Sequence, residues 1–275
     1  MTAERREVGL DRLVDDLRRL GLHQARDVLV HCSMNRIGVV RGGPGTLLAA
    51  IRAVIGPQGT VVVPTQTADN STTSRYYRSA VRDMTRRQRK RYVERLPGFH
   101  RDRTPSFRMG RLAEFVRQHP ESVRSDHPQT SFAAIGPSAA TLMARHDLAS
   151  HLGDESPLAA LYDAGGHCLL LGVGYDTCTA LHLAEYRLPP GVPVRTKQYR
   201  CFVARGNRRK SVVFRAVDLD DSCFPELGVQ LDAEPFVRSG QVGDTTARLI
   251  PVRPAVEYAI DWLARRRIAA RALTH

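Results

Sequence analysis

The stretch "DVLVHCSMNRIGVVRGGPGTLLAAIRAVIGPQGTVVVPT", residues 27–65, decides the fold class. It begins with a short apolar run rich in β-branched residues, which predicts a buried strand. Pro44 then opens a helix that Gly56 ends, and a second buried strand follows at 60–65. A strand, a helix and a strand of these lengths predict a βαβ unit, in which the two strands are parallel and the crossover is right-handed.

The same periodicities predict further elements on both sides of this unit. Helices are predicted at 9–21, 75–95, 108–120, 137–146, 225–231 and 254–268, and strands at 130–136, 167–174 and 242–253, with a strand pair around the "GN" turn at 206–207. The strand at 167–174 is apolar throughout, which is typical of a strand covered on both faces. The sequence therefore predicts a single α/β domain over residues 1–275, with a central mixed sheet, an antiparallel C-terminal portion and a basic helical insertion at about 70–103.

The composition is that of a folded intracellular protein. Of the 275 residues 42% are hydrophobic, which is enough for a core, and no apolar run is long enough to span a membrane. The charged N-terminal segment lacks the apolar stretch of a signal peptide. The five cysteines are widely spaced and include no C-x-x-C pair. We therefore expect reduced thiols, no disulfide framework, no metal site and a cytoplasmic location.

The net charge of +13 is concentrated in one part of the sequence. Between residues 75 and 103 there are eleven arginine and lysine residues against three acidic ones, and residues 86–91 read "RRQRKR". Such a field attracts anionic partners, namely nucleic acid, an acidic membrane surface or a phosphorylated cofactor. Tyrosines also alternate with arginines at 75–92, as they do in nucleic-acid binders. The alternative is a solvated helix face without a partner.

The segment "LLLGVGYDTCTALHLAEYR", residues 169–187, carries the side chains best suited to catalysis. Its two glycines after an apolar strand suggest a dinucleotide loop, but the G-x-G-x-x-G pattern lacks its third glycine. We expect a helix that begins with Asp176 or Thr177 as its N-cap. On such a helix His182 shares a face with Thr179 and Glu185, because residues three or four apart are neighbours.

A carboxylate beside an imidazole fixes one tautomer and raises the basicity of the other nitrogen, so His182 and Glu185 form a candidate general base. The Thr179 hydroxyl is a candidate donor to a developing oxyanion. Two other interpretations are an ordinary surface pair and a metal site, for which the spacing supplies no third ligand. Cys178 lies four residues before His182, so a thiolate nucleophile is an alternative to a small buried residue, and the same choice applies to Cys32.

Five segments, in order and spacing, resemble the aminoglycoside 3-N-acetyltransferase family, whose members are also called antibiotic N-acetyltransferases. They read "LVHCSMNRIGVVRGGPGTLLAAI", "GPQGTVVVPTQT", "RTPSFRMGRLAEFVRQHPESVRSDHPQTSFAAIGP", "LGDESPLAALYDAGGHCLLLGVGYDTCTALHLAEYR" and "VDLDDSCFPELG". Together they cover nearly the whole chain.

This resemblance implies an α/β/α fold, distinct from that of the common small acetyltransferases, and transfer of an acetyl group from acetyl-CoA to an amine. It implies that the histidine of the T-x-x-H-x-x-E segment acts at the amine, which here means His182 with Thr179 and Glu185. It also implies that CoA lies along the loop "HCSMN" and a second stretch within "TSFAA". The residues placed at CoA in this way are His31, Cys32, Ser33, Met34, Asn35, Ser131 and Phe132.

The implied acceptor is an aminoglycoside or a related aminocyclitol, acetylated at an amino group, with the 3-amino group of the 2-deoxystreptamine ring as the expected position. A polycationic acceptor calls for carboxylates, and those in predicted loops near strand ends are Asp69, Asp154, Glu155 and Asp176. Turn and capping roles are the alternative for each. The basic segment 75–103 falls where the family has a segment beside the acceptor cleft. Its arginines are expected to form a solvated face, to select a different amine, or to hold the phosphates of CoA.

The sequence thus predicts a cytoplasmic, acetyl-CoA-dependent N-acetyltransferase that confers aminoglycoside resistance. No metal, no nucleic acid and no membrane are expected as partners, and the protein is expected to be a monomer or a homodimer. One alternative is an acyltransferase of a biosynthetic pathway that acts on a non-aminoglycoside amine. Another is a catalytically idle homologue that binds nucleic acid.

Overall fold

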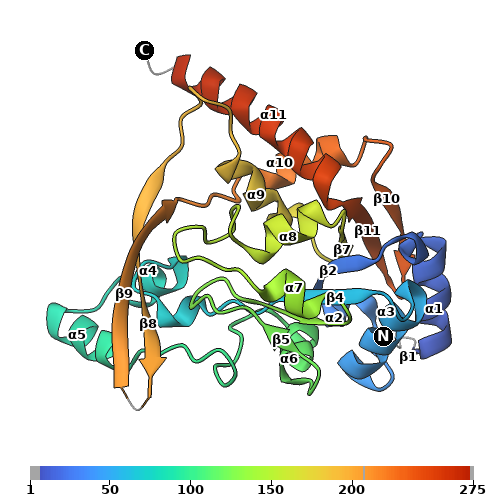
Figure 1. Cartoon of the computed structure of the whole chain (residues 1–275), viewed down its shortest axis with the longest axis horizontal. Coiled ribbons are helices and arrows are strands. Elements are labelled where there is room, and N and C mark those ends of the chain that lie inside the picture. Colours follow the sequence, from blue (N-terminus) through green and yellow to red (C-terminus); the bar gives the residue numbers. More distant parts are fainter. Residues whose placement is uncertain (1–6, 207, 273–275) are drawn as a thin grey trace, which may run out of the picture.

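The computed structural model describes residues 7–206 and 208–272, and a seven-stranded mixed sheet forms its centre (Figure 1). The strands of this sheet are β2 (Asp27–Cys32), β4 (Thr60–Pro64), β5 (Val123–Arg124), β6 (Phe132–Ile135), β7 (His167–Leu171), β10 (Arg238–Val242) and β11 (Thr245–Pro251). Their order is β10-β11-β7-β2-β4-β6-β5. The three central strands are parallel, and every pairing outside them is antiparallel.

The predicted βαβ unit is confirmed. β2 and β4 pair in parallel with Val28 opposite Val61, and α3 (Gly43–Ile55) connects them. β7 pairs in parallel with the other edge of β2. The antiparallel C-terminal portion is also present, although the sequence reasoning missed its edge strand β10. It also missed a small separate pair formed by β1 (Glu7–Val8) and β3 (Val39–Val40).

Helices cover both faces of the sheet, which gives three layers. One face packs against α3, α1 (Leu10–Arg19) and α6 (Arg111–Gln118). The other face packs against α7 (Ala139–Met143), α8 (Pro157–Asp163), α9 (His182–Tyr186), α10 (Phe224–Leu231) and α11 (Val252–Ala272). Neighbouring residues of a strand enter opposite cores, as Val28 and Leu29 do. The α/β/α arrangement follows from these two apolar layers.

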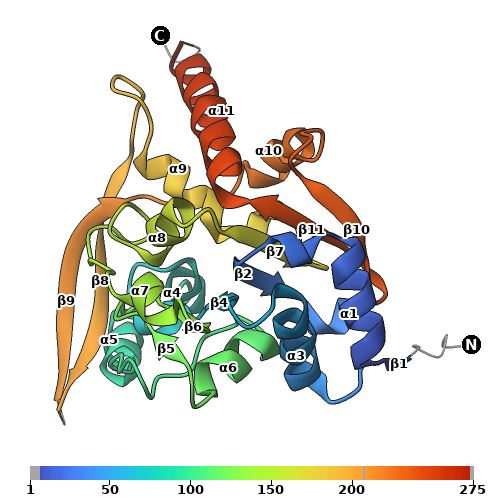
Figure 2. The same cartoon turned by 45° about the vertical axis from the view of Figure 1, so that its right-hand side comes forward.

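Two ten-residue strands, β8 (Thr196–Arg205) and β9 (Arg208–Val217), form a hairpin that is separate from the central sheet (Figures 1 and 2). The predicted strand pair is therefore confirmed. Of its "GN" turn, Asn207 lies outside the described residues. The hairpin joins the rest of the molecule through β-bridges from Ser71 to Cys201 and from Phe99 to Val203.

The basic segment does not form the single helix that was predicted at 75–95. It forms α4 (Arg75–Ala80) and α5 (Arg86–Arg95), and a turn separates them. The Thr85 hydroxyl accepts a hydrogen bond from the Gln88 amide, and the Gln88 side chain accepts one from the Thr85 amide. This capping box starts a new helix at Arg86 and explains the break. The helix predicted at 137–146 is likewise shorter, because only α7 is helical there.

The remaining short elements are α2 (Met34–Ile37) and four 3₁₀ turns, η1 (Leu22–Gln24), η2 (Ala68–Asn70), η3 (Tyr175–Thr177) and η4 (Thr179–Leu181). All five cysteines are free. None of the described helices is long and apolar enough to cross a bilayer. The first six residues, on which the signal-peptide expectation partly rests, lie outside the described residues.

Candidate active site

A cavity of about 660 Å³ opens at the carboxyl ends of the parallel strands. The segments that follow β2, β4 and β7 all contribute to its walls. From β2 the chain proceeds to β4 on one side, whereas β7 lies on the other, so the strand order reverses here. Ligands of open α/β sheets bind at such a point, outside the carboxyl ends of the strands. The other walls come from the segment leading into α4, the segment before α6, the loop before β6, residues 151–152 and β8.

The segment 31–35, at which the resemblance implies CoA, forms part of the cavity wall. Its lining residues are His31 and Cys32 at the end of β2, Ser33, and Met34 and Asn35 at the start of α2. In the second stretch at which the resemblance implied CoA, Ser131 and Phe132 are fully buried and do not line the cavity. Their neighbours Gln129 and Thr130 line it instead. Phe132 belongs to the apolar core, and the Ser131 hydroxyl donates to the carbonyl of Thr65 at 2.9 Å.

Arg124 holds the wall next to this stretch in place. Its guanidinium is buried and donates to the carbonyl of Thr65 at 2.7 Å and to that of Arg101 at 2.9 Å. It also donates to the Ser131 hydroxyl at 3.1 Å. Burial lowers the pKa of Arg124 to about 10, which leaves the group charged at neutral pH. A buried cation with several carbonyl acceptors fixes the segment after β4 relative to the loop at 101–104.

His182 and Glu185 form the hydrogen-bonded pair that the sequence predicted. His182 Nδ1 lies 2.6 Å from Glu185 Oε2, and His182 lines the cavity. Glu185 is fully buried and also accepts from Arg267 Nη2 at 2.9 Å and from the Asp220 amide at 3.3 Å. Because Nδ1 is occupied, Nε2 is the ring nitrogen that remains for a ligand. The ring of Phe224 packs on the imidazole, with centroids 4.8 Å apart.

The helix expected to begin at Asp176 or Thr177 does not form. Residues 175–181 make the turns η3 and η4, and α9 begins only at His182. Cys178, between the two turns, has φ −73° and ψ 85°, which is not helical. The first glycine of the apparent nucleotide loop, Gly172, has φ +64°, and a Cβ there would lie 2.9 Å from the Arg36 side chain. That glycine therefore serves a tight turn.

Thr179 reaches the cavity as predicted, although from a 3₁₀ turn. Its hydroxyl lies 3.1 Å from His31 Nε2, and both residues line the cavity. Burial lowers the pKa of His31 to about 4, so its imidazole is neutral near pH 7. The Thr179 hydroxyl can donate into the cavity when His31 carries its proton on Nε2, because Thr179 then accepts from His31.

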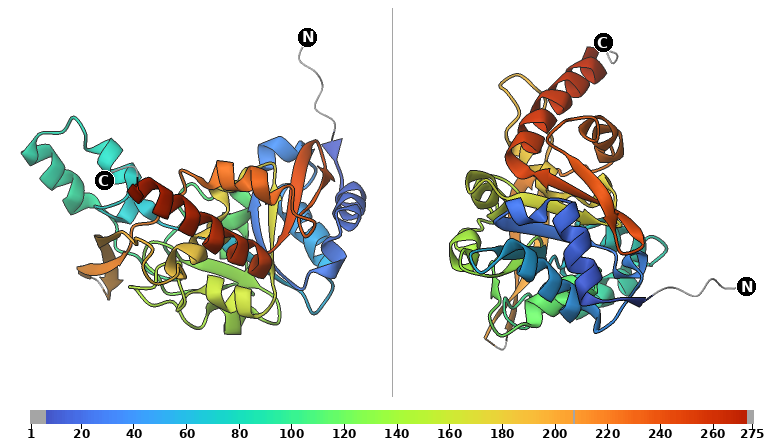
Figure 3. Two further views of the ribbon diagram at one scale, coloured as in Figure 1. Left: turned by 90° about the horizontal axis from the view of Figure 1, so that it is seen from above. Right: turned by 90° about the vertical axis from the view of Figure 1, so that its right-hand side faces the viewer.

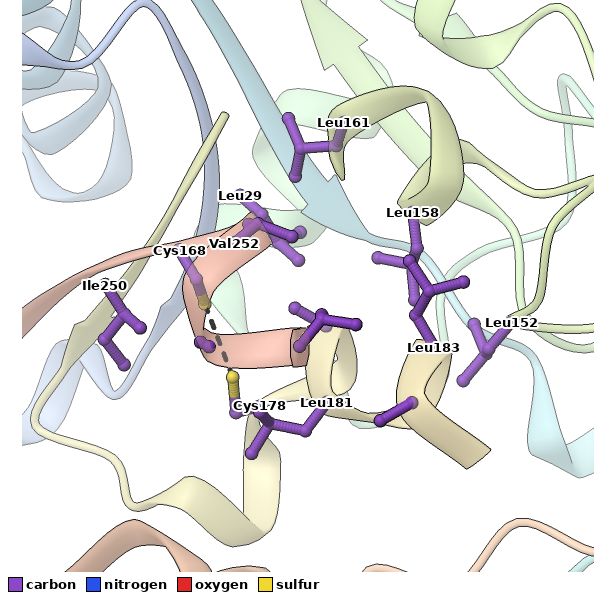
Figure 4. Packing of buried hydrophobic residues seen from close by; sticks show 14 of the residues in the cluster. Leu29, Leu152, Leu158, Leu161, Cys168, Cys178, Leu181, Leu183, Ile250 and Val252 are labelled. Atoms are coloured by element: carbon purple, nitrogen blue, oxygen red, sulfur yellow. Dashed lines mark hydrogen bonds between the residues drawn. The ribbon is translucent and has the colours of Figure 1, made fainter. Parts of the chain in front are cut away.

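Cys178 does not share a face with His182. Its Sγ lies 3.7 Å from that of Cys168, and Leu181, Leu183 and Ile250 belong to the same apolar core (Figure 4). Cys178 is 2% exposed and does not line the cavity. A small buried apolar residue is therefore the interpretation that the structure supports for Cys178.

We expect Cys178→Ala to leave unchanged the rate of the acetyl transfer that the resemblance implies, and to lower the free energy of unfolding by about 1 kcal/mol, since it removes one buried sulfur. Steady-state kinetics and thermal unfolding check this on the same preparation. Cys168→Ala is the matched control, because the two sulfurs share one environment. A large loss of rate in the Cys178 variant alone would restore the covalent mechanism.

Cys32 lines the cavity but is not poised as a nucleophile. Burial raises the pKa of the Cys32 thiol to about 12, so almost none of it is thiolate near neutral pH.

Of the four predicted acceptor-binding carboxylates, only Asp176 lines the cavity. Asp69 follows the lining residue Ala68 in the chain, and burial raises the pKa of its carboxyl group. Asp154 is paired with Arg187 at 2.7 Å, and Glu155 forms an ion pair with Arg145.

Asp221, a carboxylate that the sequence reasoning missed, also lines the cavity. It is paired with Arg75 at 2.7 Å. The other lining residues that were missed include Arg108, Arg111, His151, Lys197 and Tyr199. None of these five belongs to a local pattern that indicates a site.

His151 belongs to a cluster of three histidines beside the cavity. The ring of His127 lies 4.5 Å from that of His146 and 4.8 Å from that of His151, between centroids. Neither ring nitrogen of His151 has a hydrogen-bond partner among the described residues. Burial lowers the pKa of His127 and His151 well below the usual value and lowers that of His146 to about 4. All three imidazoles are therefore neutral near pH 7.

These depressed pKa values predict acid lability between about pH 6.5 and pH 4. The unfolded chain binds more protons in this window, so stability is complete above the unfolded pKa near 6.5 and falls as the pH decreases. His151→Phe should make the free energy of unfolding less dependent on pH, by up to about 2 kcal/mol at pH 5, since each pKa unit is worth about 1.4 kcal/mol. Thermal unfolding between pH 7.5 and 5 measures this slope.

The exposed His23 supplies the control, because His23→Phe should leave the slope as it is. Carboxylates contribute alike to the native protein and to both variants, so they cancel in the comparison; the pKa of Glu114, for example, is lowered to about 2 by its bonds to Arg117 and Ser106, against the opposing effect of burial. Its contribution is present above the unfolded pKa and is lost only at more acidic pH. An unchanged slope in His151→Phe would contradict the prediction.

Comparison with known proteins identifies a single family. The family model described as aminoglycoside 3-N-acetyltransferase matches residues 29–264. The SPbeta prophage-derived aminoglycoside N(3')-acetyltransferase-like protein YokD of Bacillus subtilis strain 168 is 33% identical over 91% of this chain and 90% of its own length. Aminoglycoside N(3)-acetyltransferase VIII of Streptomyces fradiae is 34% identical over 93% of this chain and 91% of its own.

Solved structures agree over nearly the whole chain. The structure of AAC-IIIb in a binary complex with CoASH superposes with a TM-score of 0.82 at 29% identity, covering 95% of this chain and 98% of that one. AAC-VIa bound to sisomicin gives a TM-score of 0.80 at 29% identity, covering 95% and 99%.

Proposed function

Because the chain belongs to the aminoglycoside 3-N-acetyltransferase family, we propose that it transfers the acetyl group of acetyl-CoA to the 3-amino group of the 2-deoxystreptamine ring of an aminoglycoside. We further propose that this acetylation confers resistance on the cell. The observation that carries the proposal is His182 at the cavity wall, with its Nδ1 bonded to the buried carboxylate of Glu185. Similar proteins have been solved with CoASH and with sisomicin, which supports the same pair of substrates here.

His182 is the proposed general base. An ammonium nitrogen has no lone pair, so the acceptor must lose a proton before it can attack. Nε2 takes that proton, and Glu185 at Nδ1 keeps the imidazole in the required tautomer and stabilises the imidazolium. The amine nitrogen then bonds to the thioester carbonyl carbon and gives up a second proton, and the carbon–sulfur bond breaks. One of the two protons passes to the leaving thiolate, and the other is released to water.

The oxyanion that forms during this attack needs donors. The Thr179 hydroxyl is one, in the His31 tautomer that leaves its hydrogen free. The amides of Met34 and Asn35 are others, because the first residues of α2 have no acceptor within the helix.

The cavity residues fit acetyl-CoA, which supplies the activated acetyl group. Residues 31–35 offer a wall with polar and apolar side chains for the pantetheine arm. Arg108 and Arg111 line the cavity and make no ion pair with the described residues, so their guanidinium groups are available for phosphates. In contrast, Arg75 is already paired with Asp221.

One observation favours a second candidate, an acyltransferase for a less cationic amine. Of the carboxylates that line the cavity, Asp176 alone makes no ion pair with a described residue. A polycation bound there would meet little compensating charge. An amine on a neutral or anionic molecule, as in a biosynthetic pathway, would fit a cavity with so few unpaired carboxylates better.

Thiol release from acetyl-CoA with a panel of amines tests both candidates. The panel should contain 2-deoxystreptamine aminoglycosides, simple aminocyclitols and anionic amines. Turnover with the aminoglycosides and acetylation at the 3-amino group, located by mass spectrometry and NMR, would support the first proposal. Turnover confined to the other amines would replace it with the second. Absence of CoA binding in calorimetry would refute both.

Expression in a sensitive strain, with the minimum inhibitory concentration as readout, tests the resistance role.

A further inference from the structure

Nearly all of the net charge of the chain lies in two segments. Residues 86–95, which form α5, contain six arginine and lysine residues and one glutamate. Residues 196–217, which span the hairpin, contain seven basic residues and no acidic one. We call these two segments the basic arm. The arm carries +12 of the net +13, so the remainder of the chain is almost neutral.

The fold brings the two segments of the arm together although more than a hundred residues separate them. Arg209, near the hairpin tip, donates through Nη1 to the carbonyls of Val93 at 2.7 Å and Leu96 at 2.6 Å. These carbonyls belong to the C-terminal end of α5, so Arg209 caps that end. Its guanidinium also stacks on Phe202, 4.1 Å from the ring centroid. Figures 1 and 3 show the arm at the end of the molecule opposite α1.

All cations of the arm except Lys197, which is half-buried and pairs with Asp218, are exposed and make no ion pair with a described residue. The exposed basic residues are Arg86, Arg87, Arg89, Lys90, Arg91, Arg95, Arg200, Arg205, Arg208, Arg209, Lys210 and Arg215. Within residues 7–206 and 208–272 none of these twelve makes an ion pair, whereas many arginines elsewhere do, as Arg248 does with Asp232 at 2.7 Å. Like charges at this density repel each other and cost stability, and a polyanion relieves that repulsion.

We propose that the basic arm binds the phosphodiester backbone of a nucleic-acid duplex. A ten-residue helix is about 15 Å long and ten-residue strands are about 33 Å long, and a two-stranded ribbon or a helix fits the roughly 12 Å wide major groove of DNA. Ten of the thirteen cations are arginines, which bind phosphate through two parallel hydrogen bonds. This binding is independent of the acetyl transfer proposed above.

A membrane surface fits the arm less well. Interfacial helices need an apolar face that enters the lipid. On α5 the only apolar or aromatic side chains are Tyr92 and Val93, and both are half-buried. On the hairpin, Val213 is the exposed large hydrophobic residue, at 51%. CoA fits less well too, because its few phosphates need far fewer cations, and Arg108 and Arg111 line the cavity itself.

Fluorescence anisotropy with labelled 25-base-pair DNA and RNA duplexes tests the proposal. We expect binding at 50 mM NaCl that weakens by roughly 10³-fold at 200 mM, as six or more phosphate contacts require. The variant Arg87→Gln/Lys90→Gln/Arg91→Gln should bind at least about tenfold more weakly at 100 mM NaCl and reduce the slope of log K against log salt by about 3. The two duplexes show whether the backbone is that of DNA or RNA.

The matched control removes three exposed arginines from other surfaces, Arg18→Gln/Arg26→Gln/Arg265→Gln. It lowers the net charge equally and should retain most of the affinity. Equal losses in both variants would overturn the proposal, because total charge alone would then explain binding. Absence of duplex binding at 50 mM NaCl would also overturn it. Tighter binding to phosphatidylserine vesicles than to either duplex would replace it with a membrane surface.

Discussion

His182→Ala is expected to lower kcat for acetyl transfer by about 10²- to 10⁴-fold, the range of a lost general base. The imidazole is the ring at the cavity wall whose Nδ1 is held by a buried carboxylate, so its removal takes away the proposed base. The dissociation constant of CoA should change little, because the segment 31–35 is untouched. Thiol release under saturating substrates and calorimetric titration of CoA measure the two quantities.

Controls must separate chemistry from packing, because His182 is nearly buried and its ring packs on Phe224. His182→Gln keeps most of the volume and lacks the base, so it should lose as much activity as His182→Ala while unfolding at a higher temperature. His119→Ala removes a histidine outside the cavity and should behave like the native protein. If the glutamine variant retained most of the rate, a structural role for His182 would replace the catalytic one.

The parts of the fold that the sequence predicted are those fixed by burial over many residues. The strands β2, β4 and β7 are apolar because helices cover both of their faces, and this continuous pattern is visible without the partner elements. The helix expected from residue 176 failed because tertiary contacts outweigh helix propensity there. Cys178 packs against Cys168 on the preceding strand β7, and Thr179 bonds to His31, which lies 148 residues away in the sequence.

The candidate site likewise contains residues that the local sequence indicates and residues that only the fold brings to the cavity. Thr179 and His182, which are close together in the sequence, line the cavity, and Glu185 lies directly behind His182, while their catalytic roles stay a prediction. His151 and Lys197 arrive from a loop and from the hairpin, and their local sequences contain no pattern that indicates a site. The counter-ions of Asp154 and Glu155 were equally invisible, because surface carboxylates look alike until their partners are known.

Glu185→Gln is expected to lower kcat by about 10- to 100-fold, the usual loss when the group that orients a functional histidine is removed. The carboxylate accepts from His182, Arg267 and the Asp220 amide at once. Glutamine has one acceptor oxygen and an NH₂ group, so at least one of these donors would face another donor. The loss should appear in kcat and leave the KM for acetyl-CoA nearly unchanged, because Glu185 is fully buried and does not line the cavity.

Arg267→Met tests whether that loss arises through His182 or through general weakening of the structure. It removes one donor to Glu185 and leaves the imidazole bond intact. Losing the partner of a buried charge costs up to about 3 kcal/mol, and less where water reaches the pair, as it partly does at Arg267. We therefore expect Arg267→Met to lower the unfolding temperature with little effect on kcat, and Glu185→Gln to lower both. Equal losses of kcat in the two variants would mean that Glu185 supports only the fold. Only Glu185→Gln changes the group that is bonded to His182 Nδ1, so an effect through His182 should appear in that variant alone.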